Sequence, residues 1–159
     1  MNILKLELTH FGKFHLKTIT FTSGLNIVYG KNEAGKSTIH AFVRSMLFGI
    51  PDTEEGNERY SHYLPWETPH DFCGRMWIKK DDKVYRIERN FLRPQPTVRI
   101  FDDETDESLQ PAKQHLRQIL SGLTETSYLN TICIEQLKSA TDPQLAKELE
   151  DTGRYSPVE

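Results

Sequence analysis

One run, YGKNEAGKST at residues 29–38, constrains the fold of this chain more than any other feature. Gly30, Gly35, Lys36 and Ser37 fill the fixed positions of the pattern G-x-x-x-x-G-K-[ST] without substitution. In that pattern the glycines let successive backbone N–H groups turn inward around a phosphate, and the helix that follows adds partial positive charge at its first turn. The run therefore predicts a strand, a phosphate-binding loop and a helix in immediate succession, as in an α/β fold.

The residue types of this loop assign roles to individual side chains. Lys36 is expected to reach the β- and γ-phosphates of a triphosphate, and Ser37 to place its hydroxyl on Mg²⁺. A glycine turn with an exposed lysine is the alternative, which the apolar run before the loop and the helical pattern after it disfavour. We therefore predict a triphosphate site whose loop comprises Gly30, Lys31, Asn32, Glu33, Ala34, Gly35, Lys36, Ser37 and Thr38.

Hydrophobic periodicity places this loop after a β-hairpin. Met1–Thr9 alternates apolar and polar residues, and Leu16–Phe21 alternates again after a glycine turn, which predicts two antiparallel strands. The apolar run Leu25–Tyr29 predicts a third strand that leads into the loop. From Lys36 onward the period becomes helical, with an apolar stripe of Ile39, Phe42, Val43, Met46 and Ile50.

The second half of the chain predicts a loop, a small sheet and further helices. Pro51–Phe72 is rich in charge, proline and aromatic residues and is interpreted as a loop. Alternating runs at 74–78, 84–91 and 97–101 predict an antiparallel meander. A helix is expected to start at Pro111, with an apolar stripe and Gly122 near its end. Finally, we expect a short strand over Tyr128–Glu135 and a last helix over Asp142–Glu150.

Composition limits the other functions that the chain can have. A length of 159 residues suits one compact domain, because a single core commonly occupies ~100–150 residues. The net charge of −3 gives no general attraction to nucleic acid or to an anionic membrane.

The cysteine, apolar and histidine patterns also favour some functions over others. Cys73 and Cys133 are far apart in sequence, which favours a reducing cytoplasm. The apolar run Ile39–Ile50 contains a histidine and an arginine, so it is not expected to span a bilayer. No metal spacing is found among His10, His15, His40, His62, His70 and His115.

Triphosphate hydrolysis needs a second acidic motif, and the sequence offers a weak candidate for it. Asp102 and Asp103 follow the run VRIF, and acids after an apolar strand can hold Mg²⁺ in P-loop enzymes. Further acids follow them, so a solvated turn is the favoured interpretation. If either aspartate did hold Mg²⁺, the chain would be a stand-alone small kinase or NTPase. The run LSGLTE from Leu120 is likewise better interpreted as the end of a helix.

Several quoted segments together resemble one family. These segments follow the order found in the N-terminal ATPase lobe of SMC-like double-strand-break-repair ATPases, the SbcC type and its YhaN-like relatives. They are LTHFGKF, GLNIVYGKNEAGKSTIHAFVRSMLFGIP, YLPW, YRIERNF and LNTICIEQLKSA. The resemblance extends from Met1 to about Ala140. It implies an α/β P-loop NTPase fold, an ABC-type head lobe with a mixed sheet and a smaller antiparallel sheet beside it.

The resemblance also implies site residues that the loop motif does not supply. In that family a glutamine after an apolar strand contacts Mg²⁺ and the γ-phosphate side, which assigns a catalytic and metal-binding role to Gln136. Members contact the base and ribose of ATP through two regions, which correspond here to Phe11–Lys13 and Tyr63–Trp66. We therefore expect Lys13 and Tyr63 to help bind ATP; the alternative for Tyr63 and Trp66 is a purely structural role as core or surface aromatics.

The family's complete head implies partners outside this chain. Residues 1–140 correspond to the first lobe, and residues 141–159 to a helix that leads toward a coiled coil. The C-terminal lobe of the same head, a second head on dimerisation, an SbcD-like nuclease and DNA are the partners that the resemblance implies. Because the remaining catalytic residues belong to the C-terminal lobe in that family, we expect this chain to bind Mg-ATP with little or no turnover. A non-enzymatic DNA-binding module is a further alternative, which the net charge of −3 disfavours.

Overall fold

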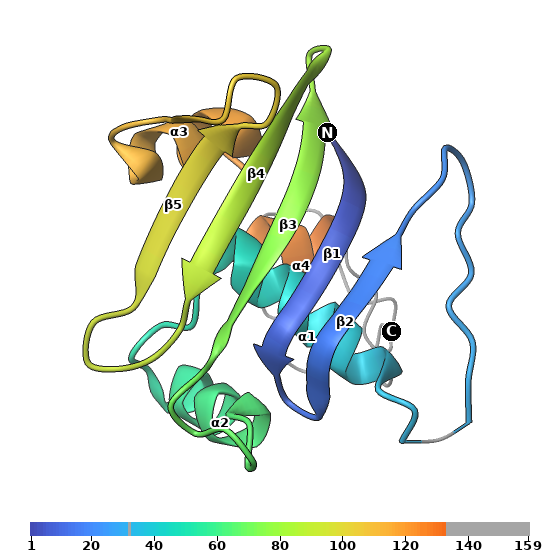
Figure 1. The fold of residues 1–159 in the computed structure, drawn as a ribbon, viewed down its shortest axis with the longest axis vertical. Coiled ribbons are helices and arrows are strands. Elements are labelled where there is room, and N and C mark those ends of the chain that lie inside the picture. Colours follow the sequence, from blue (N-terminus) through green and yellow to red (C-terminus); the bar gives the residue numbers. More distant parts are fainter. Residues whose placement is uncertain (32, 133–159) are drawn as a thin grey trace, which may run out of the picture. The chain divides into compact units, whose positions relative to one another are not determined.

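A computed structural model describes residues 1–31 and 33–132, which form one antiparallel sheet and several helices (Figure 1). The sheet order is β2-β1-β3-β4-β5-β6. The chain divides into two compact units after Gly122, and α4 belongs to the second. The strands are β1 Asn2–Phe11, β2 Phe14–Thr20, β3 Cys73–Lys80, β4 Lys83–Asn90, β5 Thr97–Asp102 and β6 Glu107–Ser108, and the helices are α1 Lys36–Phe48, α2 Glu54–Tyr63, α3 Ala112–Leu120 and α4 Glu125–Thr131.

The predicted hairpin and the predicted meander are both confirmed, and they share a single sheet. β1 pairs with β2 on one side and with β3 on the other, where Leu6 lies opposite Met76. Pairing continues antiparallel from β3 to β4, β5 and β6. Within residues 1–31 and 33–132 every strand pair is antiparallel, so the mixed sheet stays a prediction.

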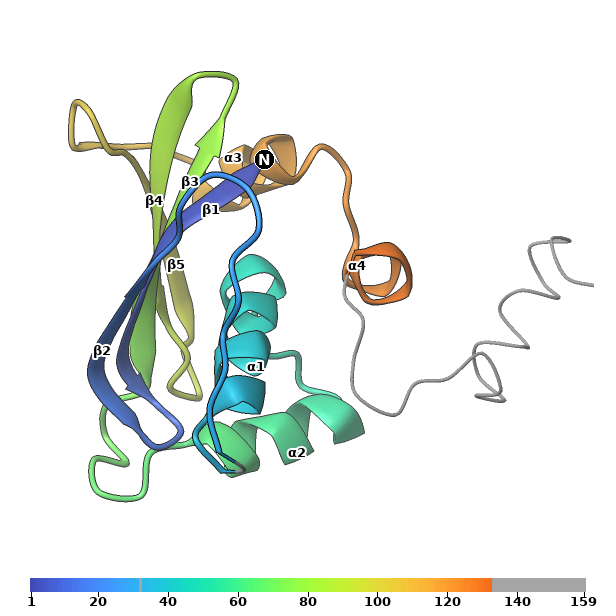
Figure 2. The ribbon, with the colours of Figure 1, turned by 90° about the vertical axis from the view of Figure 1, so that its right-hand side faces the viewer.

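The core lies between this sheet and α1. Figure 2 shows α1 and α2 on the same side of the sheet. The predicted helix α1 is confirmed, and it buries Phe42 and Met46 of the predicted stripe, while Ile39, Val43 and Ile50 are half-buried. Burial of each large apolar side chain contributes about 1.5–3 kcal/mol. The sheet supplies the other face of the core through Leu6, Leu8, Met76, Ile78, Ile87 and Ile100, all fully buried.

The expectation of a loop over Pro51–Phe72 is wrong for its first half, which forms α2. The hydroxyl of Thr53 accepts a hydrogen bond from the backbone N–H of Gly56 at 3.1 Å. Glu54 and Glu55 occupy the first turn, where carboxylates interact favourably with the helix dipole. The helix has no apolar stripe, because its buried residues are Gly56 and Arg59, and periodicity therefore did not reveal it.

The predicted strand Leu25–Tyr29 is also wrong for this structure. The segment has no strand partner among the described residues, and Figure 1 shows it running outside β2. Its side chains are exposed, with 88% of Leu25 and 90% of Tyr29 accessible to solvent. An extended segment needs a neighbouring strand to satisfy its backbone groups, so an apolar sequence alone does not make a strand.

The helix predicted from Pro111 is confirmed as α3, which ends at Leu120 and has Ser121, with φ 53°, as its C-cap. In the second unit, Tyr128–Thr131 belongs to α4 and not to the predicted strand. Thr124 caps α4 by accepting a hydrogen bond from the Ser127 N–H, so the local capping preference favours a helix there. Four predictions fall outside the described residues: the rest of that strand from Cys133, the role of Gln136, the last helix and the domain boundary at residue 140. Over the described ranges, no helix has the length and apolar character needed to cross a membrane.

Candidate nucleotide site

The loop before α1 has the backbone expected of a phosphate cradle. Gly35 is the N-cap of α1 with φ 98°, a left-handed conformation that favours glycine. A Cβ at Gly35 would lie 2.4 Å from Cζ of Phe14, so the ring also excludes a larger residue. The helix has no side-chain cap and no acidic residue in its first turn. Its first backbone N–H groups and its partial positive charge therefore remain available to an anion.

Lys36 is bound to the loop that it is predicted to serve. Its Nζ donates to the backbone carbonyls of Gly30 at 2.5 Å and Lys31 at 2.9 Å. Ser37, the predicted Mg²⁺ ligand, is exposed beside it, and Thr38 is half-buried. A triphosphate would have to replace two carbonyl acceptors of Lys36 with charged oxygens, an exchange that strengthens the hydrogen bonds of the ammonium.

The turn between β1 and β2 contacts both the loop and the end of α2. Gly12 has φ 56°, and its N–H donates to the carbonyl of Tyr63 at 2.7 Å. A Cβ at Gly12 would lie 3.0 Å from Cγ2 of Thr38 and 3.4 Å from Cδ1 of Tyr63, which shows how closely these segments approach. Lys13 extends from the same turn and donates to the backbone carbonyl of Glu33.

A cavity of about 860 Å³ lies where these segments meet. Its volume falls in the range of ~300–1,000 Å³ common for small-molecule sites. The two regions that the family resemblance assigns to the base and ribose thus line one cavity together with the loop. Trp66 stands at its edge with 91% of its surface exposed. The residues that represent the three segments are Gly12, Lys13, Glu33, Thr38, Tyr63 and Trp66.

Tyr63 is held in this position by a buried aromatic cluster. Its ring stacks on Phe11, with the centroids 5.3 Å apart and the planes 23° apart. Phe11 is fully buried and also meets Phe42 of α1 edge-on at 5.1 Å. The structural role considered for Tyr63 is therefore observed, and its contact with nucleotide stays a prediction. The cluster also fixes α1 relative to the cavity.

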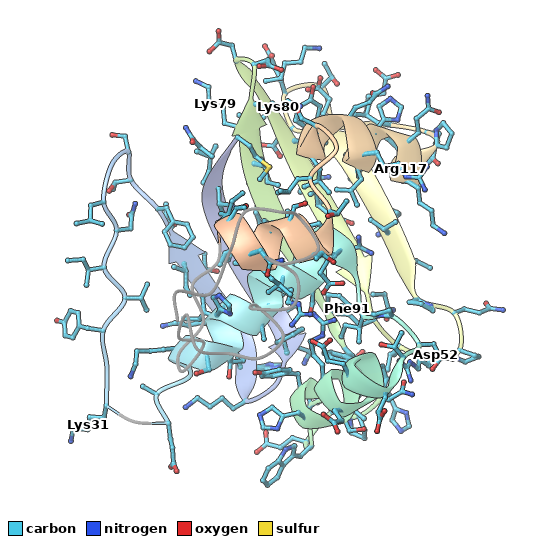
Figure 3. The ribbon with its side chains drawn as sticks, turned by 180° about the vertical axis from the view of Figure 1, so that it is seen from behind. Lys31, Asp52, Lys79, Lys80, Phe91 and Arg117 are labelled. Atoms are coloured by element: carbon cyan, nitrogen blue, oxygen red, sulfur yellow. The ribbon has the colours of Figure 1, made fainter. Side chains whose placement is uncertain are left out.

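Among the described residues, the side chains of Lys31, Asp102 and Asp103 do not line the cavity. Figure 3 shows Lys31 at the far end of its segment, away from the sheet. Asn32 and Gln136 lie outside the described residues. Asp102 accepts from the backbone N–H of Glu104 at 3.1 Å, and Asp103 accepts from Trp77 Nε1 at 3.0 Å. Asp102 is the last residue of β5 and Asp103 comes next, and Figure 1 shows the end of β5 at the opposite end of the sheet from the start of α1.

Arg89 is a half-buried residue behind α1 that no sequence pattern singled out. On β4, its Nε donates to the carbonyl of Met46 at 2.7 Å and its Nη2 to that of Leu47 at 3.3 Å. Burial lowers the pKa of this guanidinium to about 10. The side chain thus binds the last carbonyls of α1 and ties the far end of the loop helix to the sheet. An arginine at an inward strand position was the signal available in the sequence.

His10 and His15 form a second contact that sequence spacing concealed. They face each other across the β1–β2 hairpin, with their Nδ1 atoms 3.1 Å apart, and both line the cavity. A turn centred between Gly12 and Lys13 pairs residue 11 with 14 and therefore 10 with 15. The hairpin register was the signal that could have revealed this pair. Over residues 1–31 and 33–132, no group of three or more His, Cys, Asp or Glu side chains is arranged to hold a metal ion.

Comparison with known proteins identifies the family. A family model described as an AAA domain matches residues 1–154. The uncharacterized protein YhaN of Bacillus subtilis (strain 168) is 43% identical over 56 residues, which make up 35% of this chain and 6% of that protein. The DNA double-strand break repair Rad50 ATPase of Thermococcus kodakarensis is 26% identical over 146 residues, 86% of this chain and 15% of that protein.

The matched region is a small part of both relatives, since the two matches cover 6% and 15% of their lengths. The family model, in contrast, extends over almost the whole chain. These matches confirm the resemblance to the N-terminal ATPase lobe of the SMC-like SbcC and YhaN-type proteins. The chain belongs to this family of AAA domains.

Proposed function

We propose that this chain is the Mg-ATP-binding N-terminal lobe of an SMC-like ATPase head. The observation that carries the proposal is the meeting of three segments at one cavity: the loop before α1, the β1–β2 turn and the end of α2. The loop offers backbone N–H groups for phosphates, and the cavity beside it has room for a nucleoside. The Rad50 ATPase among the relatives supports ATP as the nucleotide.

In this proposal Lys36 binds the phosphates of Mg-ATP and Ser37 binds its metal ion. Lys36 releases the carbonyls of Gly30 and Lys31 and binds the β- and γ-phosphates. The hydroxyl of Ser37 is a Mg²⁺ ligand, together with Gln136 by family resemblance. The hydroxyl oxygen of Ser37 fits this role, because Mg²⁺ takes oxygen ligands and commonly combines few protein groups with the phosphate oxygens of its substrate. When bound, Mg²⁺ neutralises charge that develops on the phosphates.

Lys13 and Tyr63 would contact the nucleoside. Lys13 holds the β1–β2 turn against the loop through the carbonyl of Glu33, so its ammonium lies between the two ends of the site. Tyr63 is fixed by Phe11, and this rigid support reduces the entropy lost on binding. Trp66, which is highly exposed, can cover the nucleoside from the open side of the cavity.

Turnover would require a second lobe. Asp102 and Asp103 are engaged in contacts at the other end of the sheet, which argues against their service as the Mg²⁺ acid of a stand-alone kinase. We propose that the C-terminal lobe of the same head supplies that acid and pairs with the exposed segment Leu25–Tyr29, and that a second head closes over the nucleotide. In the complete cytoplasmic protein, ATP binding would then regulate an SbcD-like nuclease and DNA processing.

Calorimetric titration with a non-hydrolysable ATP analogue and Mg²⁺ tests this function. A hydrogen bond to a charged group contributes about 1.5–3 kcal/mol, so Lys36→Ala should weaken binding about 10- to 100-fold. Lys31→Ala is the matched control, because only the backbone carbonyl of Lys31 contacts Lys36 and its side chain points away from the sheet (Figure 3). Equal affinities for wild type and Lys36→Ala would refute the phosphate site.

A phosphate-release assay tests whether ATP hydrolysis needs residues of the C-terminal lobe. The chain alone should release phosphate from ATP at a rate that does not differ between wild type and Lys36→Ala. Turnover by highly purified chain that Lys36→Ala abolishes would show that this lobe contains a complete catalytic site, and would revive the stand-alone enzyme. In that case Asp102→Asn and Asp103→Asn would identify the Mg²⁺ acid.

A further inference from the structure

The His10–His15 pair is a hydrogen-bonded unit within the wall of the cavity. The two rings are tilted by 60° with centroids 4.5 Å apart, and their Nδ1 atoms are 3.1 Å apart. Oγ1 of Thr68 lies 3.2 Å from Nδ1 of His10, so the pair is also attached to the loop after α2. All three residues line the cavity. The pair therefore joins the hairpin and the loop after α2 at the cavity wall.

This contact determines the chemistry of the atoms that remain. A hydrogen bond between two Nδ1 atoms requires a proton on one ring nitrogen and a lone pair on the other. In two neutral imidazoles, the ring with a proton on Nδ1 has an Nε2 acceptor, and the other ring has an Nε2–H donor. The contact thus leaves one donor and one acceptor, whichever ring carries the Nδ1 proton.

We propose that the His10–His15 pair recognises the base of the bound nucleotide by its donor and acceptor pattern. Adenine offers the same complementary pattern, an amino donor at position 6 beside a ring-nitrogen acceptor, which Asn and Gln recognise in nucleic acids. The inference rests on the proposed function, because it assumes that the cavity holds a nucleoside. It assigns base discrimination to two side chains that the loop motif does not include.

Two other nitrogen-bearing side chains of the cavity, Lys13 and His62, are less suited to this role. The ammonium of Lys13 is bound to the carbonyl of Glu33 at the phosphate side. The ring of His62 packs edge-on against Tyr63 with the centroids 4.7 Å apart, and among the described residues no contact with a second imidazole fixes its tautomer. Only the His10–His15 contact, within the described lining, fixes the tautomers of two rings relative to each other.

The test compares the dissociation constants of three ligands in the presence of Mg²⁺. They are a non-hydrolysable ATP analogue, the matching analogue of purine riboside triphosphate, and tripolyphosphate. Purine riboside lacks the 6-amino group of adenosine. Loss of one neutral hydrogen bond corresponds to a ratio of dissociation constants of about 3- to 10-fold in favour of adenine. His15→Phe keeps a ring of similar size at an exposed position and removes the partner of His10. His62→Phe is the matched control, and His10→Phe is a second test variant.

The expected result is an adenine preference in wild type and His62→Phe that falls to about one in His15→Phe and His10→Phe, with tripolyphosphate binding unchanged. An adenine preference that survives in His15→Phe would overturn the inference and leave the proposed function intact. Absence of binding of all three ligands to folded wild type would instead overturn the proposed function, and the inference with it. Thermal unfolding of each variant verifies that the proteins compared are folded.

Discussion

Gly74 of β3 leaves space for the Phe42 ring of α1, and its replacement by alanine should lower the free energy of unfolding. A Cβ at this position would lie 2.4 Å from Cε2 and 2.5 Å from Cζ of Phe42, and 2.9 Å from the backbone oxygen of Glu7. Phe42 is fully buried and packs edge-on against Phe11, so its ring has no free space to enter. The methyl group would therefore push α1 away from the sheet.

The magnitude follows from two opposing terms. Overpacking of a filled core costs about 1–3 kcal/mol. Replacing glycine by alanine also lowers the conformational entropy of the unfolded chain, which offsets about 0.4–1 kcal/mol of this loss of stability. The free energy of unfolding should thus fall by about 1–2 kcal/mol, and the melting temperature by about 3–6 °C for a chain of this size.

Urea unfolding followed by circular dichroism measures this loss, and a double-mutant cycle assigns it to Phe42. The midpoint should fall while the slope m stays constant. Phe42→Leu vacates the space that the new methyl group needs, so in that background Gly74→Ala should cost about 1 kcal/mol less. If Gly74→Ala is as stable as wild type, or if its cost is the same with Phe42 and with Leu at position 42, the Cβ at position 74 does not clash with the Phe42 ring.

Three further predictions concern single residues. Asp82 has φ 62° in the β3–β4 turn, so Asp82→Gly should raise the free energy of unfolding by about 0.5–1 kcal/mol in urea unfolding, and a decrease would contradict the turn geometry. Thr53→Ala removes the cap of α2 and should lower stability by about 1 kcal/mol, whereas Thr53→Ser should retain most of it. Burial raises the pKa of the Cys73 thiol above its ordinary value of 9.0, so the folded state keeps this proton to higher pH and its stability falls as pH rises through that range. In a Cys133→Ser background, iodoacetamide at pH 9 should therefore modify folded chain more slowly than urea-unfolded chain, and equal rates would contradict the burial.

The strands were predictable because alternation directly reports which face is buried. Leucines of β1 alternate with polar residues, and Leu6 and Leu8 are fully buried. The same logic failed for Leu25–Tyr29, since strand formation depends on a neighbouring strand and the apolar sequence does not show whether one is present. It also missed α2, whose identity lies in the Thr53 cap and the acids after it and not in apolar spacing.

For the candidate site, only the local backbone of the loop before α1 was predictable from the sequence. Gly35 has the left-handed conformation for which the motif reserves a glycine. Side-chain partners from distant segments were not predictable in this way. Lys36 contacts carbonyls that a motif does not specify, Arg89 reaches α1 from β4, and the His10–His15 contact depends on the register of a hairpin. Such contacts are determined by tertiary packing, which single-residue patterns do not encode.

Mapping of backbone amide chemical shifts by NMR tests the central claim that the loop and the cavity form one nucleotide site. On titration with a non-hydrolysable ATP analogue and Mg²⁺, the amides of Gly35, Lys36 and Ser37 should shift together with those of Lys13 and Tyr63, at one common dissociation constant. Shifts confined to the loop, with Lys13 and Tyr63 unchanged at saturation, would contradict the claim that the cavity receives the nucleoside. An unchanged spectrum of folded protein would contradict nucleotide binding by this lobe altogether.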